Sequence, residues 1–189
     1  RLDDPFLDPL ELRSDSTLGI PGLLQAVRAG NVLMANAPGS AFLESPALLG
    51  FLPALSRHLL GEELQLPSLA TWWCGEHAAM DAALPRLAAC AIKSTYPMAG
   101  DERGFQSALG RDLAQSELGQ WAGRIARQGE EHTVQSYLPL SQIPTWQPGT
   151  HADAGQIVPR SAMLRVFAVC DANRSWQVIP GGMARVAHR

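Results

Sequence analysis

The sequence predicts an α/β (α+β) fold, in which an α/β layer is followed by a smaller α+β unit. Two observations favour this class: strand and helix patterns alternate through the first half of the chain, and the last part is rich in short strands. The two patterns meet near residues 84–87, where a domain boundary is expected. With 189 residues, of which 46% are hydrophobic and 17% charged, the chain is large enough to bury a sizeable core.

The first part of the chain begins without a regular pattern and then alternates. Residues 1–19 hold paired acids and two prolines but no apolar period, which indicates a loop or a short strand. In residues 20–30, Pro21 near the start, leucines at helical spacing and Gly30 at the end predict a short helix. Three consecutive apolar residues within 31–37 then predict a buried strand.

Two helices and a short extended segment are expected next. Residues 46–60 place six leucines on one helical face, and Pro53 inside this pattern predicts a kink. An extended segment is expected over 67–74, and a further helix over 76–87.

The second part starts with the apolar run 87–92, which predicts a buried strand that brings Lys93 to its end. Glycines and a proline interrupt residues 94–104 and predict a loop. The remaining patterns predict a helix over 113–125, a strand over 133–140, a loop over 143–159, a β-pair of 163–170 with 176–179, and a final short strand after 180–182.

Charge and composition argue against two classes of partner. A formal net charge of −3 and a pI of about 5.9 leave no basic surplus to neutralise phosphates, so no nucleic acid is expected as a partner. No apolar run approaches the roughly 20 residues of a bilayer span, so no membrane is expected either. Three cysteines, odd in number and far apart, do not form a disulfide framework, and a cytoplasmic location is expected.

Lys93 is the single lysine of the chain. A lysine that closes an apolar strand can aim a compact positive charge into a cleft, where phosphate oxygens are natural partners. The alternative is a solvated strand end, and the spacing alone leaves both interpretations open.

Other charged residues are further candidates for a site. Arg1, Asp3 and Asp4 cluster with Asp8 before a turn, where they form either a site for a cationic or amide-rich substrate or a solvated chain end. Arg165 stands between two apolar residues of a predicted strand, so it needs a carboxylate or phosphate partner. The histidines and cysteines are spaced to supply at most two ligands in one place, so no metal site is expected within the chain.

Short motifs along the whole chain carry a resemblance to a known family. They include Arg1-Leu-Asp-Asp-Pro-Phe-Leu-Asp-Pro-Leu, Ala70-Thr-Trp-Trp-Cys-Gly, Ile92-Lys93, Leu164-Arg-Val-Phe and Pro180-Gly-Gly-Met-Ala-Arg-Val-Ala. With these motifs the chain resembles the circularly permuted ATP-grasp proteins, bacterial proteins of the DUF404/DUF407 type that are described as glutathionylspermidine synthase-like. The resemblance implies that the chain is the later part of a longer, full-length protein.

The resemblance also implies a division of the chain. Residues 1–86 are similar to the pre-ATP-grasp layer that helps to bind the substrate. Residues 87–138 are similar to the small ATP-grasp subdomain, and residues 139–189 to the beginning of the large one. In such proteins ATP and Mg²⁺ are held between the two subdomains.

Site residues are implied position by position. Lys93 matches the strand-end lysine that contacts the ATP phosphates. Arg165, the implied catalytic residue, matches a strand arginine that faces the phosphates and stabilises charge during phosphoryl transfer. The residues that match the hinge, whose backbone meets adenine, are Gln135, Ser136, Tyr137 and Leu138. The residues of the opening layer that are implied in substrate binding are Arg1, Asp3 and Asp4.

The implied activity is that of an ATP-dependent carboxylate–amine ligase, which forms a peptide bond through an acyl-phosphate. Its substrates are expected to be small-molecule or peptide amines and carboxylates. Because the Mg²⁺ ligands of the family lie upstream, outside this chain, we expect the chain to be inactive alone and to need the remaining segment of the full-length protein.

A non-catalytic module is the alternative: a degenerate ATP-grasp domain that acts as a scaffold or binds a partner. Two departures from the family pattern favour it. Residues 94–104 lack the glycine-rich loop expected after Lys93, and Ser136 stands where an acidic residue is common.

Overall fold

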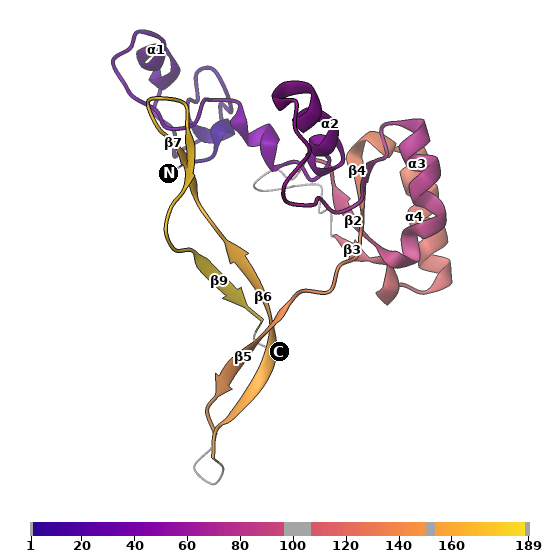
Figure 1. Cartoon of the computed structure of the whole chain (residues 1–189). Coiled ribbons are helices and arrows are strands. Elements are labelled where there is room, and N and C mark those ends of the chain that lie inside the picture. The colour runs from indigo at the N-terminus through magenta and orange to yellow at the C-terminus, as the bar shows by residue number, and fades with distance from the viewer. Residues whose placement is uncertain (1, 97–106, 150–153, 188–189) are drawn as a thin grey trace. The chain divides into compact units, whose positions relative to one another are not determined.

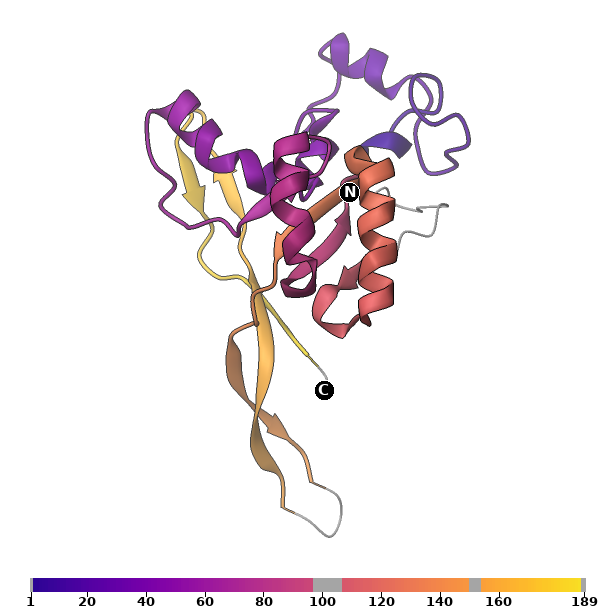
Figure 2. The same cartoon turned by 90° about the vertical axis from the view of Figure 1, so that its right-hand side faces the viewer.

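The computed structural model describes residues 2–96, 107–149 and 154–187. The chain forms two compact units, residues 1–137 and 138–189, and each is described by itself (Figures 1 and 2). Helices are combined with sheets in which all the described strand pairs are antiparallel, which confirms the expected α+β character.

The first unit is built on a four-stranded sheet. Its strands, in spatial order, are β1 (Thr71–Trp73), β4 (His132–Ser136), β2 (Cys90–Ser94) and β3 (Ala108–Leu109). The register places Lys93 of β2 opposite Thr133 of β4, and Gln135 of β4 opposite both Thr71 and Ala91. Since side chains alternate between the two faces of a strand, these residues all share one face of the sheet.

The opposite face of this sheet carries the hydrophobic core. Helices α3 (His77–Ala83) and α4 (Gln115–Arg127) lie side by side against it (Figures 1 and 2). The buried members of this core are Cys74, Ala83, Leu87, Cys90, Ile92, Ile125 and Val134. Glu117 caps the start of α4 by accepting a hydrogen bond from the Ala114 N–H. One face of the sheet is therefore committed to packing, and the other carries the polar residues.

The regular elements of the segment before the sheet are helices joined by irregular chain. It contains 3₁₀ helices at Asp4–Phe6 and Ser40–Glu44, α1 at Leu23–Arg28 and α2 at Leu48–Leu60. Pro53 lies inside α2, as expected from its position within the leucine pattern of residues 46–60. Helix α2 packs beside β1, where the ring centroids of Phe51 and Trp73 are 6.4 Å apart. Within the described residues, no helix combines the length and the apolar character needed to cross a bilayer.

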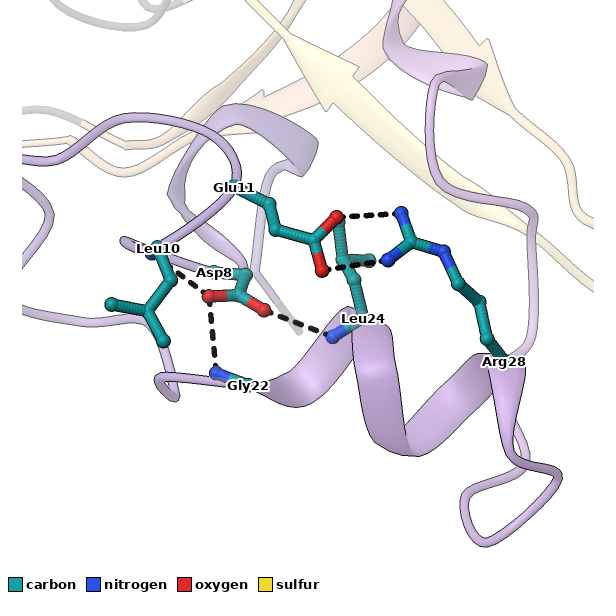
Figure 3. A network of polar contacts seen from close by, with 6 residues as sticks. All are labelled: Asp8, Leu10, Glu11, Gly22, Leu24 and Arg28. Atoms are coloured by element: carbon teal, nitrogen blue, oxygen red, sulfur yellow. Dashed lines mark hydrogen bonds and ion pairs between the residues drawn. The ribbon is translucent and has the colours of Figure 1, made fainter.

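Asp8 organises the start of α1 (Figure 3). Its buried carboxylate accepts hydrogen bonds from the N–H groups of Leu10, Gly22 and Leu24, at 2.9, 3.1 and 3.0 Å. Burial acts to raise the pKa of Asp8, but these N–H groups, together with that of Glu11, hold the pKa below its ordinary value. Asp8 therefore stabilises the fold, and neither alternative that the sequence left open, a substrate site or a solvated chain end, describes this residue.

Replacing Asp8 by asparagine is expected to lower the melting temperature of the chain by about 5 °C at pH 7, because an amide replaces one acceptor oxygen by a donor. The Asp8 carboxylate has a lower pKa in the folded state than in the unfolded state. Its stabilising effect is thus complete above the unfolded pKa and is lost as the pH falls through the folded pKa. Melting curves should be measured between pH 7 and pH 3. The difference in melting temperature between wild type and variant should become smaller only as the pH falls toward the acidic end of this range.

The control for this prediction is Asp15→Asn, which removes the exposed ion pair between Asp15 and Arg13 and should change the melting temperature little. Equal losses in the two variants would contradict the role assigned to Asp8.

The second unit holds two small sheets. One has the order β5-β6-β9, formed by Gln142–Gln147, Gln156–Arg165 and Met183–Val186, and the other pairs β7 (Ala168–Cys170) with β8 (Trp176–Val178). The turn from β7 to β8 is held by the Asp171 carboxylate, which accepts from the N–H groups of Asn173 and Ser175. None of the described residues of this unit is buried, so its sheets lack a core of their own within these residues.

Amides of β6 in this chain are expected to exchange with deuterium faster than those of β4. Both strands are central in their sheets, but most residues of β4 are buried while none of β6 is. Exchange followed by mass spectrometry of peptides from the two strands measures this difference. Equal protection of β6 and β4 would show that the second unit is covered in solution.

Several sequence-based predictions of elements were wrong. Residues 31–37 form no strand: Leu33 is fully exposed and Asn36 has a φ of 68°, which breaks an extended path. The run expected as a strand over 87–92 is a 3₁₀ helix up to Ala89, and only Cys90–Ser94 is extended. Helix α3 likewise ends at Ala83 and not at residue 87.

Of the loop expected over 143–159, residues 143–147 belong to β5 and residues 156–159 to β6, while residues 150–153 lie outside the described residues. Pro144 and Pro159 lie directly opposite each other in the β5–β6 register. Prolines cannot donate to a ladder, but two that share one pair position disturb it least. The strand expected over 163–170 is divided between β6 and β7. The expected β-pair around residues 171–175 and the final strand are confirmed. The assignment of residues 1–86, 87–138 and 139–189 to family subdomains stays a prediction. In the structure, β1 from the first range and β2 from the second belong to one sheet.

Candidate functional site

Lys93 lies on the sheet face that the helices α3 and α4 leave uncovered. It is the fourth residue of β2, half-buried, and its ammonium Nζ donates a hydrogen bond to Gln135 Oε1 at 2.7 Å. Burial lowers the pKa of Lys93 below the ordinary value for a lysine. A partly desolvated ammonium of this kind attracts an anion more strongly than one in bulk water, because water screens it less.

Gln135 is the residue that holds the lysine, and it is almost buried, with 4% of its surface exposed. Its amide Nε2 donates to Thr71 Oγ1 at 3.0 Å, and that hydroxyl donates to the Leu69 carbonyl at 2.9 Å. The structure thus brings together two residues that the sequence proposed separately, Lys93 and Gln135. Thr71 was missed, because a threonine in a short strand gives no signal until its register is known.

The segment after Gln135 leaves the sheet. Ser136, the last residue of β4, donates its N–H to the Ala70 carbonyl at 2.9 Å, and Tyr137 donates its N–H to the Ala89 carbonyl at 3.1 Å. The first compact unit ends at Tyr137 and the second begins at Leu138. Of the hinge residues expected from the sequence, Gln135, Ser136 and Tyr137 thus belong to the first unit and Leu138 to the second.

Arg165 belongs to the second unit. It is the last residue of β6, exposed, and it lies opposite Met183 of β9. A side chain at Gly182 would approach the Arg165 carbonyl to 2.7 Å, so the second glycine of the Pro-Gly-Gly motif permits β9 to pair here. The backbone around Arg165 is thus held by the strand pair, while its guanidinium is exposed to solvent.

Asp3 and Asp4 line a cavity of about 690 Å³ in the first unit. Asp4 Oδ2 accepts a hydrogen bond from the N–H of Ala41, another lining residue, at 2.9 Å. The lining also includes residues that the sequence did not indicate, among them Phe42, Glu44 and Tyr96. Arg1, the third residue expected here, lies outside the described residues.

The cavity and the polar sheet face are linked through the end of β2. The Thr95 hydroxyl is 2.9 Å from that of Thr133, and the Thr95 carbonyl accepts a hydrogen bond from the Ser45 hydroxyl at 2.6 Å. Ser45 and Tyr96 both line the cavity. An acidic cavity and a lysine-bearing sheet face therefore lie within one compact unit. Among the described residues, no group of three or more His, Cys, Asp or Glu side chains is placed to hold a metal ion.

Comparison with known proteins gives the family. Residues 1–187 match the family described as circularly permuted ATP-grasp type 2. The uncharacterized protein Rv2411c of Mycobacterium tuberculosis is 34% identical over 187 residues, which are 99% of this chain and 32% of that protein. The uncharacterized protein sll0335 of Synechocystis sp. is 32% identical over 189 residues, or 100% of this chain and 37% of that protein. The uncharacterized protein Rv2567 of M. tuberculosis is 35% identical over 181 residues, or 96% of this chain and 19% of that protein.

The chain thus spans about a third of the length of the first two relatives and about a fifth of the third. ATP-grasp proteins generally bind ATP and Mg²⁺, and their scaffold is that of an ATP-dependent ligase. Because the match covers nearly every residue, the conclusion is plain: the chain belongs to the circularly permuted ATP-grasp type 2 family.

Proposed function

We propose that this chain supplies the phosphate-binding face of an ATP-dependent carboxylate–amine ligase. The observation that carries the proposal is Lys93: the single lysine of the chain stands half-buried on the sheet face opposite α3 and α4, held by Gln135. An ammonium in this position is a suitable partner for phosphate oxygens. The family relationship supports ATP as the source of those oxygens.

ATP supplies the phosphoryl group that activates a carboxylate as an acyl-phosphate, and Mg²⁺ neutralises charge on the phosphates. Of the described residues, Lys93 is proposed to contact the phosphates and the segment 135–138 to meet adenine through its backbone. Arg165 is proposed to stabilise charge that develops during phosphoryl transfer. The Mg²⁺ ligands are proposed to lie outside this chain, so the chain alone is expected to bind nucleotide without completing ligation.

The acidic cavity is proposed to receive the amine substrate. Asp3, Asp4 and Glu44 supply negative charge, and the aromatic rings of Phe42 and Tyr96 lie in the same lining. Carboxylates and aromatic rings together favour an ammonium group carried on an apolar body.

Lys93 can report directly on nucleotide binding. As the single lysine, it is the one side-chain amine that an acylating reagent modifies in this chain. We expect ATP with Mg²⁺ to slow acetylation of the peptide that contains Lys93 at least several-fold, and AMP, which lacks the outer phosphates, to protect it less. Arg127→Ala, which removes a charge from α4 on the opposite side of the sheet, should leave this protection unchanged.

The experiment should be run on this chain and on the full-length natural protein. Absence of protection in both would contradict the ligase proposal and favour the non-catalytic scaffold. Protection in the full-length protein together with release of ADP in the presence of an amine would support it.

The amine cavity has a separate test. Calorimetric titration of the chain with 1,4-diaminobutane and with lysine amide should give a dissociation constant that rises about tenfold in Asp3→Asn and in Glu44→Gln. Glu76→Gln, an exposed acid outside the cavity lining, is the matched control. Equal binding by all four proteins would exclude the cavity as the amine site.

A further inference from the structure

A directed chain of hydrogen bonds ends at Lys93. It runs from the Lys93 ammonium to the Gln135 carbonyl oxygen, from the Gln135 amide nitrogen to the Thr71 hydroxyl oxygen, and from that hydroxyl to the Leu69 carbonyl. The distances are 2.7, 3.0 and 2.9 Å in this order. The three strands β2, β4 and β1 thus each contribute one side chain to a single series of hydrogen bonds.

The direction of this chain is imposed by its two ends. A lysine ammonium can only donate, so Gln135 must present its oxygen to Lys93. At the other end, the Leu69 carbonyl can only accept, so it takes the Thr71 hydroxyl proton and leaves the hydroxyl oxygen free to accept from Gln135. Turning the Gln135 amide over would place its NH₂ group against the ammonium and its oxygen against Thr71.

Burial makes this arrangement costly to lose. Gln135 is 4% exposed, so water cannot readily replace a missing partner for its amide. Gln135 lies directly opposite Thr71 on β1, and diagonally across the same face from Lys93 on β2. Pairing in the sheet therefore fixes the distances, and only the orientation of the amide remains to be chosen.

We propose that Gln135 is a positioning residue for Lys93, and that Thr71 fixes the Gln135 amide so that its oxygen holds the ammonium ready for a phosphate anion. This inference rests on the proposed function, because the phosphate is the anion that the lysine awaits. An ammonium carries three N–H donors and the contact to Gln135 uses one, so the positioned lysine keeps donors for an anion. Ordering the side chain before binding reduces the entropy lost when the anion arrives.

The test uses the single lysine as a spectroscopic probe. With lysine labelled by ¹³C at Cε, the chain gives one lysine signal, whose titration with pH reports the Lys93 ammonium in the absence of nucleotide. In Thr71→Val the midpoint is expected to fall by about half a unit, because the amide is no longer held with its oxygen toward the ammonium. Thr71→Ser keeps the hydroxyl and should restore the wild-type midpoint.

Gln135→Glu gives the opposite sign. A carboxylate beside the ammonium should raise the midpoint by about one unit or more, since it favours the charged lysine. Thr145→Val is the matched control: the Thr145 hydroxyl also donates to a carbonyl two residues earlier in a strand, but in the second unit. That variant should leave the titration unchanged.

The same variants are then titrated with ATP and Mg²⁺. We expect Thr71→Val to weaken binding about threefold to tenfold and Gln135→Glu at least tenfold, because the carboxylate both occupies the ammonium and repels phosphate. Unchanged Lys93 midpoints in folded Thr71→Val and Gln135→Glu would overturn the positioning role. A different outcome is that the Lys93 midpoints shift in the variants, but neither the wild-type chain nor the full-length protein binds nucleotide. This would support the orientation of Lys93 by Gln135 and Thr71, and would overturn only the proposal that the anion is ATP.

Discussion

Replacing Lys93 by methionine is expected to weaken the binding of ATP with Mg²⁺ by roughly tenfold to a hundredfold, the size of a lost charge-assisted hydrogen bond. Methionine keeps much of the length and apolar body of the lysine, so the half-buried site stays filled. Its thioether cannot donate to the Gln135 oxygen or to a phosphate. Isothermal calorimetry on this chain and on the full-length protein measures the change.

Two further variants sharpen this result. Lys93→Arg keeps the charge but presents a planar fork on a different stem, so it should recover only part of the affinity. Arg127→Ala removes one positive charge from α4 and should bind as wild type. Burial lowers the pKa of Lys93, so its ammonium loses the proton at a lower pH than an ordinary lysine does. The affinity of the wild type for ATP should therefore begin to decline at a lower pH as well. Wild-type affinity in Lys93→Met would refute the role of the lysine.

Replacing Gly110 by alanine is expected to destabilise the first unit by about 3 kcal/mol or more, a cost typical of severe overpacking. Gly110 is buried directly after β3. A Cβ at this position would overlap the Leu87 carbonyl oxygen and approach Ala88 Cα to 3.0 Å. These are backbone atoms of the 3₁₀ helix Leu84–Ala89, next to core residue Leu87, so relief requires the helix to move. Thermal unfolding should show a fall of roughly 10 °C.

Gly119→Ala is the matched control within the same unit. Gly119 lies in α4, and a Cβ there would meet nothing within 4 Å. Alanine in a helix interior is favoured over glycine by about 0.5–1 kcal/mol, so this variant should melt at the same temperature or slightly higher. Similar melting temperatures for Gly110→Ala and Gly119→Ala would refute the close approach at Gly110.

Local patterns were enough to predict most of the helices. The helical pattern of residues 113–125 predicted α4, and the leucines of residues 46–60 predicted α2, because one face of such a helix must pack against the core. Lys93 also stood out in the sequence as a candidate site residue, because it is a single lysine after an apolar run. What failed were short segments such as 31–37, whose apolar residues pair with no other strand in the described structure.

By itself, then, the sequence determined the mixture of helices and strands, the family and the candidate lysine. Only the tertiary structure decided what holds that lysine: Gln135 is 42 residues away along the chain from Lys93, and Thr71 is 64 residues away from Gln135. The physical reason is register, since a shift of one residue between β2 and β4 would turn Gln135 to the opposite face. In the same way, the sequence left open whether the acidic cluster with Asp8 forms a substrate site or a solvated chain end, and only folding placed the start of α1 around the Asp8 carboxylate.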